Sequence, residues 1–520
     1  MQNDKMISGK TFHHHNNSPA PGSVEETKRF NSIQEGFKKQ YLEVFPDKLA
    51  ARTVIIIPSL SLDAEILSKI KGANYYEERL LCLLMLLRMP LTKIIYVTSM
   101  PVSDIIIDYY LHLLPGITGH HARKRLTLFS CFDSSGKPLT QKILDRPRLI
   151  QRIKQQITDV SSTHLTCFNI TPLEKSLAVQ LGVPLFGTDP DKFYEGSKSG
   201  ARKTFRECGV NLPDGYEDLH TKEDIINALT ELKKKDPGLK KAVVKVNDGF
   251  SGDGNAIFRY NNISDGIINE ASLVQNLAPV SKEVSKEVFF EKFNSMGGVA
   301  EVFLEGEIKT SPSVQCVIHP DKTIEIASTH DQLLGGDEGQ IFIGAIFPAD
   351  KAYSKMLAIE GRKIAETLAA KGALGRFAID FLSVKQDDGE WKNYAIEINL
   401  RKGGTTHPFL MLQFLTNGKY NANEGNFITA SGNERFYFAS DNVISDKYKG
   451  LTPYDLINIA TYHSLMYDGA SQEGIMFHLI GALSEFGKLG LVCIGNSPQR
   501  AKDFYDKALQ VLDYECSDDE

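Results

Sequence analysis

Short apolar runs and amphipathic stretches alternate along the chain after residue 50. Residues 54–58 form a continuous apolar run that ends in proline, which is typical of a strand buried on both faces of a parallel sheet. Because strands that alternate with helices form βαβ units, we expect a Rossmann-like domain over residues 51–190. The further elements predicted in it are strands at 93–98, 126–130 and 165–168 and helices at 75–88 and 103–114.

Beyond this domain the pattern changes. Residues 187–200 are rich in glycine, serine, aspartate and lysine and predict a linker. Short alternating strands then dominate residues 298–347, which is an α+β pattern. The elements predicted around them are helices at 201–208, 222–234 and 353–370 and strands at 241–246, 376–384 and 391–400. We expect an α/β protein (α+β in the core) with four segments: an N-terminal extension (1–50), the Rossmann-like domain (51–190), the core domain (191–420) and a small C-terminal α/β domain (421–520).

Composition and charge exclude several classes of protein. The 520 residues carry 59 Lys and Arg against 65 Asp and Glu, and this net charge of -6 argues against a nucleic-acid partner. The most apolar run, residues 80–87, is far shorter than the roughly 20 residues that span a bilayer, so no membrane partner is expected. The first 30 residues are polar, and the seven cysteines contain no CxxC pair. These features predict a cytoplasmic protein with reduced thiols.

A lysine followed by a glycine-rich loop is the sharpest local sign of chemistry. Lys245 lies near the end of a predicted strand, and glycines let backbone N–H groups approach an anion closely. The pattern predicts a phosphate site, although a glycine-rich hairpin turn fits the same residues. No Gly-Lys-Ser/Thr follows, so the loop is not a Walker A motif. The loop residues concerned are Gly249, Ser251, Gly252 and Gly254.

Polar side chains on two later strands are the second sign. Side chains alternate along a strand, so Arg376 and Asp380 share one face, and Glu397, Asn399 and Arg401 share one face of the next strand. Carboxylate and amide oxygens on adjacent strands suit Mg²⁺, whose octahedron nucleotide phosphates can complete. Two half-exposed strands with solvated polar faces are the alternative.

Three polar residues end another predicted strand. His330, Asp331 and Gln332 come just before Gly335 and Gly336. They could orient an acceptor substrate, or His330 could act as a base. A turn with solvated polar tips fits the same residues.

The order of these features resembles the ATP-grasp fold: Lys198, Lys245, the glycine-rich loop, a glutamate-rich strand from Glu301, and Asp380-x(16)-Glu397-x-Asn399. A closer resemblance is to the pheganomycin-type peptide ligases, in which a pre-ATP-grasp domain precedes this core. The match extends over about residues 51–500. The strings that carry it are YEERLL (76–81), LDRPRL (144–149), SPSVQ (311–315), STHDQ (328–332) and EINLRKGGTTHP (397–408).

The resemblance implies a role for each candidate residue. Asp380, Glu397 and Asn399 match Mg²⁺ ligands, while Arg376 and Arg401 are candidates to stabilise charge on the reacting groups. The residues implied at ATP are Lys198 and Lys245 at the phosphates and the adenine side, Glu301 at the hinge, Phe303 beside adenine, and Glu307, or alternatively Glu305, at the ribose.

The implied activity is that of an ATP-dependent carboxylate–amine ligase. Such an enzyme phosphorylates a carboxylate, and an amine then attacks the acyl phosphate to give an amide, ADP and phosphate. The cofactors would be ATP and Mg²⁺, and the substrates a small-molecule carboxylate and an amine, each an amino acid or peptide. A non-catalytic nucleotide-binding protein and a small-molecule kinase are the alternatives. The sequence leaves the oligomeric state open, with a homodimer as one candidate because dimers are the commonest assembly.

Overall fold

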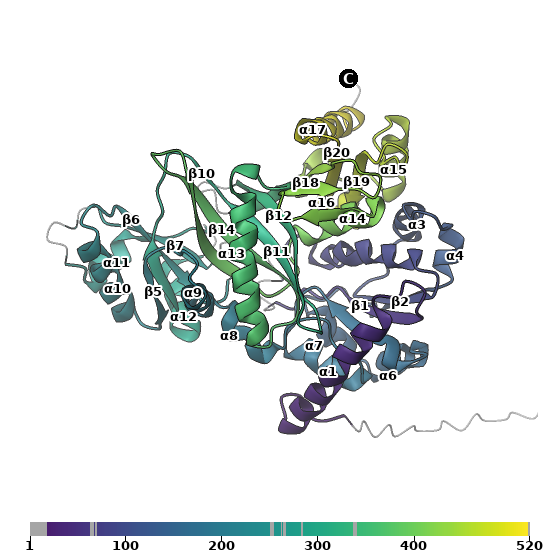
Figure 1. The fold of residues 1–520 in the computed structure, drawn as a ribbon, viewed down its shortest axis with the longest axis horizontal. Coiled ribbons are helices and arrows are strands. Elements are labelled where there is room, and N and C mark those ends of the chain that lie inside the picture. Colours follow the sequence, from purple (N-terminus) through teal and green to yellow (C-terminus); the bar gives the residue numbers. More distant parts are fainter. Residues whose placement is uncertain are drawn as a thin grey trace, which may run out of the picture.

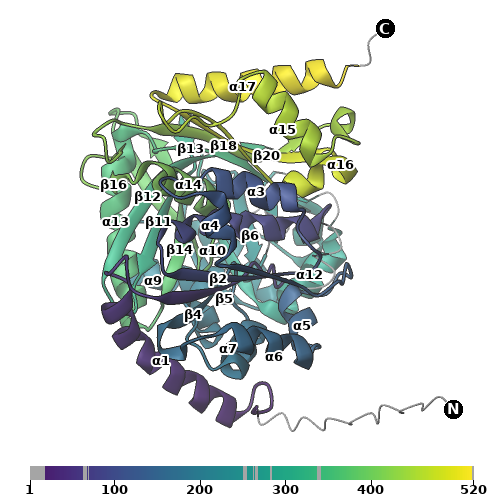
Figure 2. The same cartoon turned by 90° about the vertical axis from the view of Figure 1, so that its right-hand side faces the viewer.

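The computed structural model describes residues 18–62, 67, 70–249, 254–261, 263, 267–281, 284–335 and 341–517. Three large sheets, with four, five and nine strands, organise these residues. In Figure 1 the five-stranded sheet lies at the left, the nine-stranded sheet in the centre and the four-stranded sheet at the lower right. Figure 2 shows helix α1 (Val24–Val44) along the outside of the four-stranded sheet.

The four-stranded sheet confirms the Rossmann-like prediction. Its strands are all parallel, in the order β3-β2-β1-β4, and the apolar run is strand β1, buried along its whole length. The strands are β1 (Arg52–Ile57), β2 (Thr92–Thr98), β3 (Leu126–Ser130) and β4 (Thr163–Cys167). Around them lie η1 (Ala73–Arg88), α3 (Asp104–His112), α4 (Gly119–Arg123), α5 (Leu139–Leu144), α6 (Pro147–Gln156), η2 (Val160–Ser162) and α7 (Pro172–Leu181). Element η1 is a long 3-10 helix where the sequence predicted a helix.

The predicted linker at 187–200 is wrong, because most of it is helical. It contains η3 (Pro190–Lys192), α8 (Phe193–Gly196) and the start of α9 (Lys198–Glu207). The hydroxyl of Ser197 caps α9 by accepting a bond from the N–H of Gly200 at 3.0 Å. A Cβ on Gly200 would lie 1.7 Å from the carbonyl oxygen of Tyr194, so this glycine permits two helices to approach closely.

The five-stranded sheet is antiparallel, in the order β5-β9-β6-β7-β8. Its central strand, β6, has alternating residues in an apolar core and ends at the glycine-rich loop. The strands are β5 (Gly215–Leu219), β6 (Lys241–Val246), β7 (Asn255–Arg259), β8 (Leu277–Pro279) and β9 (Gly298–Val302). Helices α10 (Lys222–Lys235), α11 (Glu270–Asn276) and α12 (Lys286–Met296) accompany them.

The nine-stranded sheet runs in the order β10-β14-β11-β12-β13-β18-β20-β19, and β15 also pairs with β14. Helix α13 (Lys351–Ala370) packs against β11 and β12 (Figure 1). The strands are β10 (Lys309–Thr310), β11 (Pro312–Ile318), β12 (Ile324–Gly335), β13 (Ile341–Phe347), β14 (Gly375–Lys385), β15 (Trp391–Asn399), β18 (Phe436–Ile444), β19 (Gly474–His478) and β20 (Lys488–Gly495).

Apart from β16 and β17, which form a two-stranded sheet, the C-terminal strands do not form a sheet of their own. β18 pairs with β13, so β18, β20 and β19 extend the central sheet. The other elements of this part are α14 (Thr406–Thr416), β16 (Lys419–Asn421), β17 (Asn426–Ile428), η4 (Asp446–Tyr448), α15 (Pro453–Tyr462), η5 (Ile480–Ala482), α16 (Leu483–Phe486) and α17 (Pro498–Glu515).

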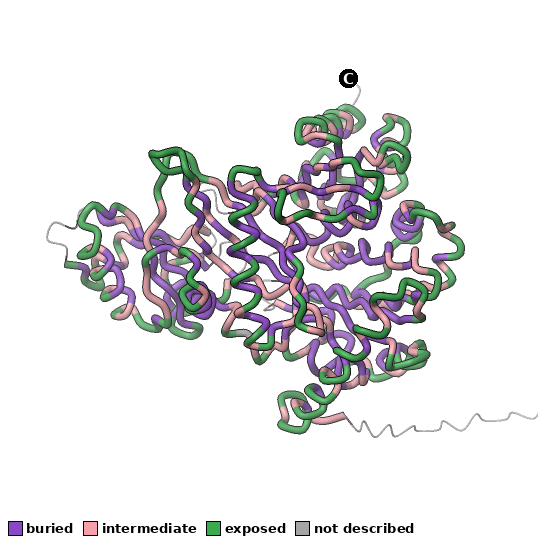
Figure 3. Tube along the Cα trace, viewed as in Figure 1, coloured by how far each residue is buried: buried purple, intermediate pink, exposed green. Residues whose placement is uncertain are grey.

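One hydrophobic core joins the beginning of the chain to its end. Leu80 and Leu84 of η1 belong to the same buried cluster as Met411 of α14 and Leu491 of β20. Figure 3 shows this buried interior running between the sheets. All seven cysteines are free thiols. In the part of the chain that the structure describes, no helix combines the length and hydropathy needed to cross a membrane.

Candidate active site

A cavity of about 1000 Å³ opens between the five-stranded and nine-stranded sheets. Strands β6 and β9 line one side, and β14 and β15 line the other. Residues from distant parts of the chain complete the wall: Tyr76 and Arg79 come from η1, and Asp441 comes from β18. The cavity thus brings together most of the residues that the sequence predicted as functional.

Asp380 and Glu397 are direct partners across β14 and β15, and both line the cavity. The Nδ2 of Asn399 donates to Asp380 Oδ2 at 2.9 Å, and the Nε2 of Gln332 donates to Asp380 Oδ1 at 2.7 Å. Burial, and then the charge of Glu397, raise the pKa of Asp380 to about 6. Two carboxylates at one point repel each other, so a cation bound between them would be stabilised.

Lys198 and Lys245 reach this cavity from the other side. Lys198 is the first residue of α9 and forms an ion pair with Glu397. Lys245 extends from β6 and forms an ion pair with Glu301 of β9. Burial would raise the pKa of Glu397, but Lys198 and Arg401 hold this pKa below its usual value. The structure therefore brings the predicted lysines and the predicted metal ligands together.

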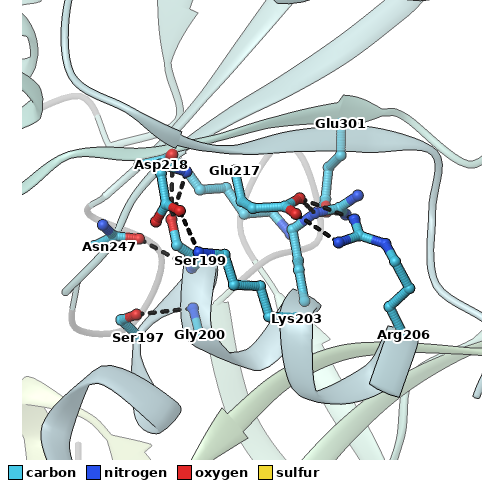
Figure 4. Close-up of polar contacts among 12 residues, drawn as sticks. Ser197, Ser199, Gly200, Lys203, Arg206, Glu217, Asp218, Asn247 and Glu301 are labelled. Atoms are coloured by element: carbon cyan, nitrogen blue, oxygen red, sulfur yellow. Dashed lines mark hydrogen bonds and ion pairs between the residues drawn. The ribbon is translucent and has the colours of Figure 1, made fainter. Parts of the chain in front are cut away.

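A network of arginines fixes Glu301. The Nη1 of Arg202 donates to Glu301 Oε2 at 2.6 Å, and its Nε donates to Glu217 at 3.3 Å. Arg206 reaches Glu217 through two bonds of 2.6 and 3.0 Å (Figure 4). Lys198 and Arg202 are four residues apart on α9, so they share one face of the helix. Arg202 is a residue that sequence reasoning missed.

The start of α9 is also bonded to the loop that follows β6. The N–H of Ser199 donates to Asn247 Oδ1 at 3.0 Å, and the N–H of Asp218 donates to the Ser199 hydroxyl at 3.0 Å (Figure 4). The N–H of Lys198 donates to the carbonyl oxygen of Asn247 at 3.1 Å. These bonds hold Lys198 beside the glycine-rich loop.

Of the predicted loop residues, Gly249 and Gly254 line the cavity. A Cβ on Gly254 would lie 2.5 Å from Val246 Cγ2, so the loop closes tightly at its ends. Ser251 and Gly252 lie outside the described residues.

The hinge after β9 agrees with the prediction in part. Phe303 lines the cavity and is half-buried. Glu305 and Glu307 are exposed and are not among the residues that line the cavity, so their place at a ribose stays a prediction. These two residues lie in the segment between β9 and β10, where the alternation of a strand no longer applies.

Arg401 lines the cavity just beyond β15. Burial lowers its pKa, and the charges of Glu397 and Asp380 act against that effect. Its Nη1 donates to the carbonyl oxygen of Lys402 at 3.2 Å. Arg401 is therefore placed to meet a negative charge beside the two carboxylates.

The structure does not support a catalytic role for Arg376 or His330, because neither lines the cavity. The Nη1 of Arg376 donates to Gln315 at 3.2 Å, and its guanidinium lies 5.8 Å from the ring of Phe409 on α14. His330 is fully buried, and its Nε2 is 2.5 Å from the hydroxyl of Tyr437. Burial, and then the charge of Arg376, lower the pKa of His330 to about 3, so the ring is neutral in the core.

Sequence reasoning also missed several further cavity residues, among them Tyr76, Arg79, Phe168 and Asp441. The string at 76–81 carried the family resemblance, but nothing in it indicated a contact with the core domain. Asp441 lies on β18, a strand that the pattern did not predict. Only long-range packing brings these residues to one wall.

Comparison with known families agrees with this geometry. The family model described as IQCH-like, ATP-grasp matches residues 191–265 and 260–423. The chain contains an ATP-grasp domain. A second family model, described as PGM1 C-terminal domain, matches residues 455–508, beyond the ATP-grasp domain.

Two curated proteins resemble the chain over most of its length. An L-propargylglycine–L-glutamate ligase from Streptantibioticus cattleyicolor is 26% identical over 471 residues, which cover 88% of this chain and 94% of the ligase. The IQ motif-containing protein H of Danio rerio is 20% identical over 547 residues, covering 95% of this chain and 51% of that protein. The chain thus spans about half the length of the second relative.

Solved structures share the fold at low sequence identity. Biotin carboxylase from Campylobacter jejuni aligns with a TM-score of 0.53 and 13% identity, covering 88% of this chain and 91% of that one. N5-carboxyaminoimidazole ribonucleotide synthetase, in an ADP complex, aligns with a TM-score of 0.51 and 13% identity, covering 90% and 98%. At this identity the likeness shows the ATP-grasp architecture, and the activity has to be argued from the site.

Proposed function

We propose that this protein is an ATP-dependent carboxylate–amine ligase that forms an amide through an acyl phosphate. The observation that carries the proposal is the cross-strand pair Asp380 and Glu397, which faces Lys198 and Lys245 in one cavity. The 26% identity to a ligase named for two amino acids supports amino acids or peptides as substrates. ATP is the proposed co-substrate and Mg²⁺ the proposed metal.

The nucleotide would bind between the two sheets. Lys198 and Lys245 supply positive charge for its phosphates, and Glu301 holds Lys245 in place. Phe303 on one side and Leu382 and Ile396 on the other are half-buried and give the cavity apolar walls that suit a purine ring.

The residues present fit a Mg²⁺ ion. Asp380 and Glu397 supply two carboxylates, and Asn399 donates through its Nδ2, so its amide oxygen is available to a cation. Among the described residues no cluster of three or more His, Cys, Asp or Glu side chains occurs, so phosphate oxygens would have to complete the coordination. When bound, the ion would neutralise charge on the phosphates.

The chemistry then needs two transfers. A carboxylate oxygen of the donor substrate attacks the γ-phosphorus, the bond to the leaving oxygen breaks, and ADP departs with the electron pair. The amine nitrogen next attacks the acyl carbon, and the bond from this carbon to the phosphate oxygen breaks. Phosphate leaves with the electron pair and takes the proton that the nitrogen loses. Arg401 lies beside Asp380 and Glu397 and can bind the negative charge on the acyl phosphate.

The test is ATP turnover with pools of amino acids, with the products identified by mass spectrometry. Release of ADP that requires both an acid and an amine, with an amide product, is expected. Turnover that gives a phosphorylated product alone would identify a kinase, and no nucleotide binding by calorimetry would refute an ATP-dependent activity of any kind.

A matched pair of variants on α9 sharpens this test. Lys198→Met should weaken nucleotide binding, because Lys198 lines the cavity. Lys203→Met should leave binding unchanged, because Lys203 is largely exposed and pairs with Asp218 outside the cavity (Figure 4). Equal effects of the two substitutions would contradict the placement of the phosphates.

A further inference from the structure

One ion pair on the cavity wall, between Arg79 and Asp441, has no role in the chemistry proposed above. Among the described residues, three ion pairs have both partners on the cavity wall: Lys198–Glu397, Lys245–Glu301 and Arg79–Asp441. The first two belong to the proposed nucleotide and metal sites. The third is formed by residues of η1 and β18, which lie 362 positions apart in the chain.

The guanidinium of Arg79 is firmly positioned. It lies 4.0 Å from the centre of the Tyr76 ring and 5.6 Å from that of Phe168, so two aromatic rings contact this cation. The Nζ of Lys488 donates to the Tyr76 hydroxyl at 2.7 Å, which ties this ring to β20. The side chains of Arg79 and Asp441 are 11% and 14% exposed, so the pair is largely buried and still open to the cavity.

This wall adjoins the proposed site of the acyl phosphate. The N–H of Lys402 donates to the carbonyl oxygen of Phe168 at 3.1 Å, which places Phe168 next to the segment that carries Arg401. Arg79 and Arg401 line the same cavity. A group bound at Arg79 and Asp441 would therefore lie close to the carbon that the amine attacks.

We propose that Arg79 and Asp441 bind the head group of an α-amino acid acceptor, with Arg79 on its carboxylate and Asp441 on its ammonium group, whose proton Asp441 accepts so that the neutral amine can attack. An α-amino acid carries one negative and one positive group on the same carbon, and this wall presents one charge of each sign side by side. The planar guanidinium of an arginine suits bidentate contact with a carboxylate. The aromatic rings of Tyr76 and Phe168 exclude water around the head group. This proposal rests on the ligase activity proposed above and deepens it by naming the class of acceptor.

The experiment supplies the full-length protein with ATP, Mg²⁺, a pool of the twenty proteinogenic L-amino acids and an equal pool of their C-terminal amides. The amides of aspartate and glutamate are left out, because their side-chain carboxylates could act as donors. The free amino acids can then serve as donor or acceptor, whereas the remaining amides can serve only as acceptors. Mass spectrometry separates dipeptides from dipeptide amides. The wild type should favour dipeptides by about 10- to 100-fold, the factor for losing a hydrogen bond to a charged group.

Variants locate the source of this preference. Arg79→Gln should bring the ratio of dipeptide to dipeptide amide close to one, and Asp441→Asn should lower both products while nucleotide binding measured by calorimetry stays unchanged. The matched control is Arg88→Gln, on the same element η1. Arg88 donates to the Phe414 carbonyl at 2.8 Å and to Asn417 at 2.6 Å, away from the cavity, and its replacement should leave the ratio unchanged.

A charge swap distinguishes recognition of the acceptor from a purely structural role of the Arg79–Asp441 ion pair. The double variant Arg79→Asp with Asp441→Arg restores an ion pair of reversed polarity, so a structural role predicts recovery of activity and our proposal predicts none. Recovery in the swap, or equal use of free and amidated acceptors by the wild type, would overturn the acceptor site alone. Absence of any ligation product while ATP still binds would refute the proposed ligase function and this site with it.

Discussion

A row of polar residues crosses the nine-stranded sheet, and its two ends differ in what covers them: one end is open to the cavity and the other is covered by α14. Glu397, Asp380, Ser313 and His330 are successive cross-strand partners and form one row across β15, β14, β11 and β12. The first three line the cavity, whereas His330 is buried beneath Phe409 of α14 and bonded to Tyr437. The periodicity of a strand fixes which face a side chain occupies, but the packing of α14 decides whether that face meets ligand or core.

The largest effect is expected at the open end of this row. Glu397→Gln removes a charge that faces Lys198 and the proposed metal, so turnover should fall by about 10²- to 10³-fold or more. Steady-state ADP release measures it, and circular dichroism should show an intact fold. Activity equal to the wild type would refute the role given to Glu397.

A smaller effect on activity is expected at Arg202, which does not line the cavity but bonds to Glu301, a residue that does. Arg202→Met leaves Glu301 with Lys245 as its partner, which should displace Lys245 and raise the KM for ATP by about 10-fold, an effect of about 1.4 kcal/mol. The kcat should change less than KM. The matched substitution Arg206→Met removes an arginine that is 54% exposed and pairs with Glu217, so it should have little effect. A similar KM for both variants would contradict a positioning role for Arg202.

At the covered end of the row we expect an effect on stability. His330→Phe leaves the Tyr437 hydroxyl without this partner in the core and should lower the free energy of unfolding by about 1–3 kcal/mol, measured in urea. The double variant with Tyr437→Phe removes both polar groups and should recover part of that loss. If His330→Phe instead reduced turnover with stability unchanged, the assignment of His330 to the core would be wrong.

The smallest effect is a pH dependence. His330 has a pKa of about 3 in the folded protein, below the value of about 6.5 for an unperturbed histidine. As the pH falls below about 6.5, only the unfolded chain takes up this proton, so the folded state loses stability, by about 1 kcal/mol between pH 7 and 5.5.

Buried carboxyl groups have the opposite effect, because their protonation stabilises the folded state as the pH falls. Burial raises the pKa of Glu77 to about 7, despite its bonds from Ser99, so the folded state takes up that proton first as the pH falls. The measurement is therefore the difference in unfolding free energy between wild type and His330→Phe at each pH. This difference should shrink toward low pH, and a constant difference would contradict a neutral His330.

Much of the site could be predicted because its signals are local. Lys245 with its glycine-rich loop and the spacing from Asp380 to Glu397 and Asn399 are patterns within single strands and turns. The parallel sheet of the Rossmann-like domain was predicted for the same reason, since each buried strand is a short continuous apolar run. The helices at 187–200 were missed because their glycines and serines serve capping and close packing there.

The sequence by itself determined the order of the lysines, the loop and the acidic strands, and hence the ATP-grasp resemblance. The tertiary structure decided which polar residues reach the cavity: it buried His330, placed the half-buried Arg376 near Phe409 of α14, left Glu307 outside, and joined Arg79 to Asp441. The periodicity of a sequence shows which face of a helix or strand each residue occupies, because it arises from the backbone geometry of that element. Contact between η1 and β18 depends instead on how hydrophobic faces hundreds of residues apart pack together, and no short stretch of sequence records that.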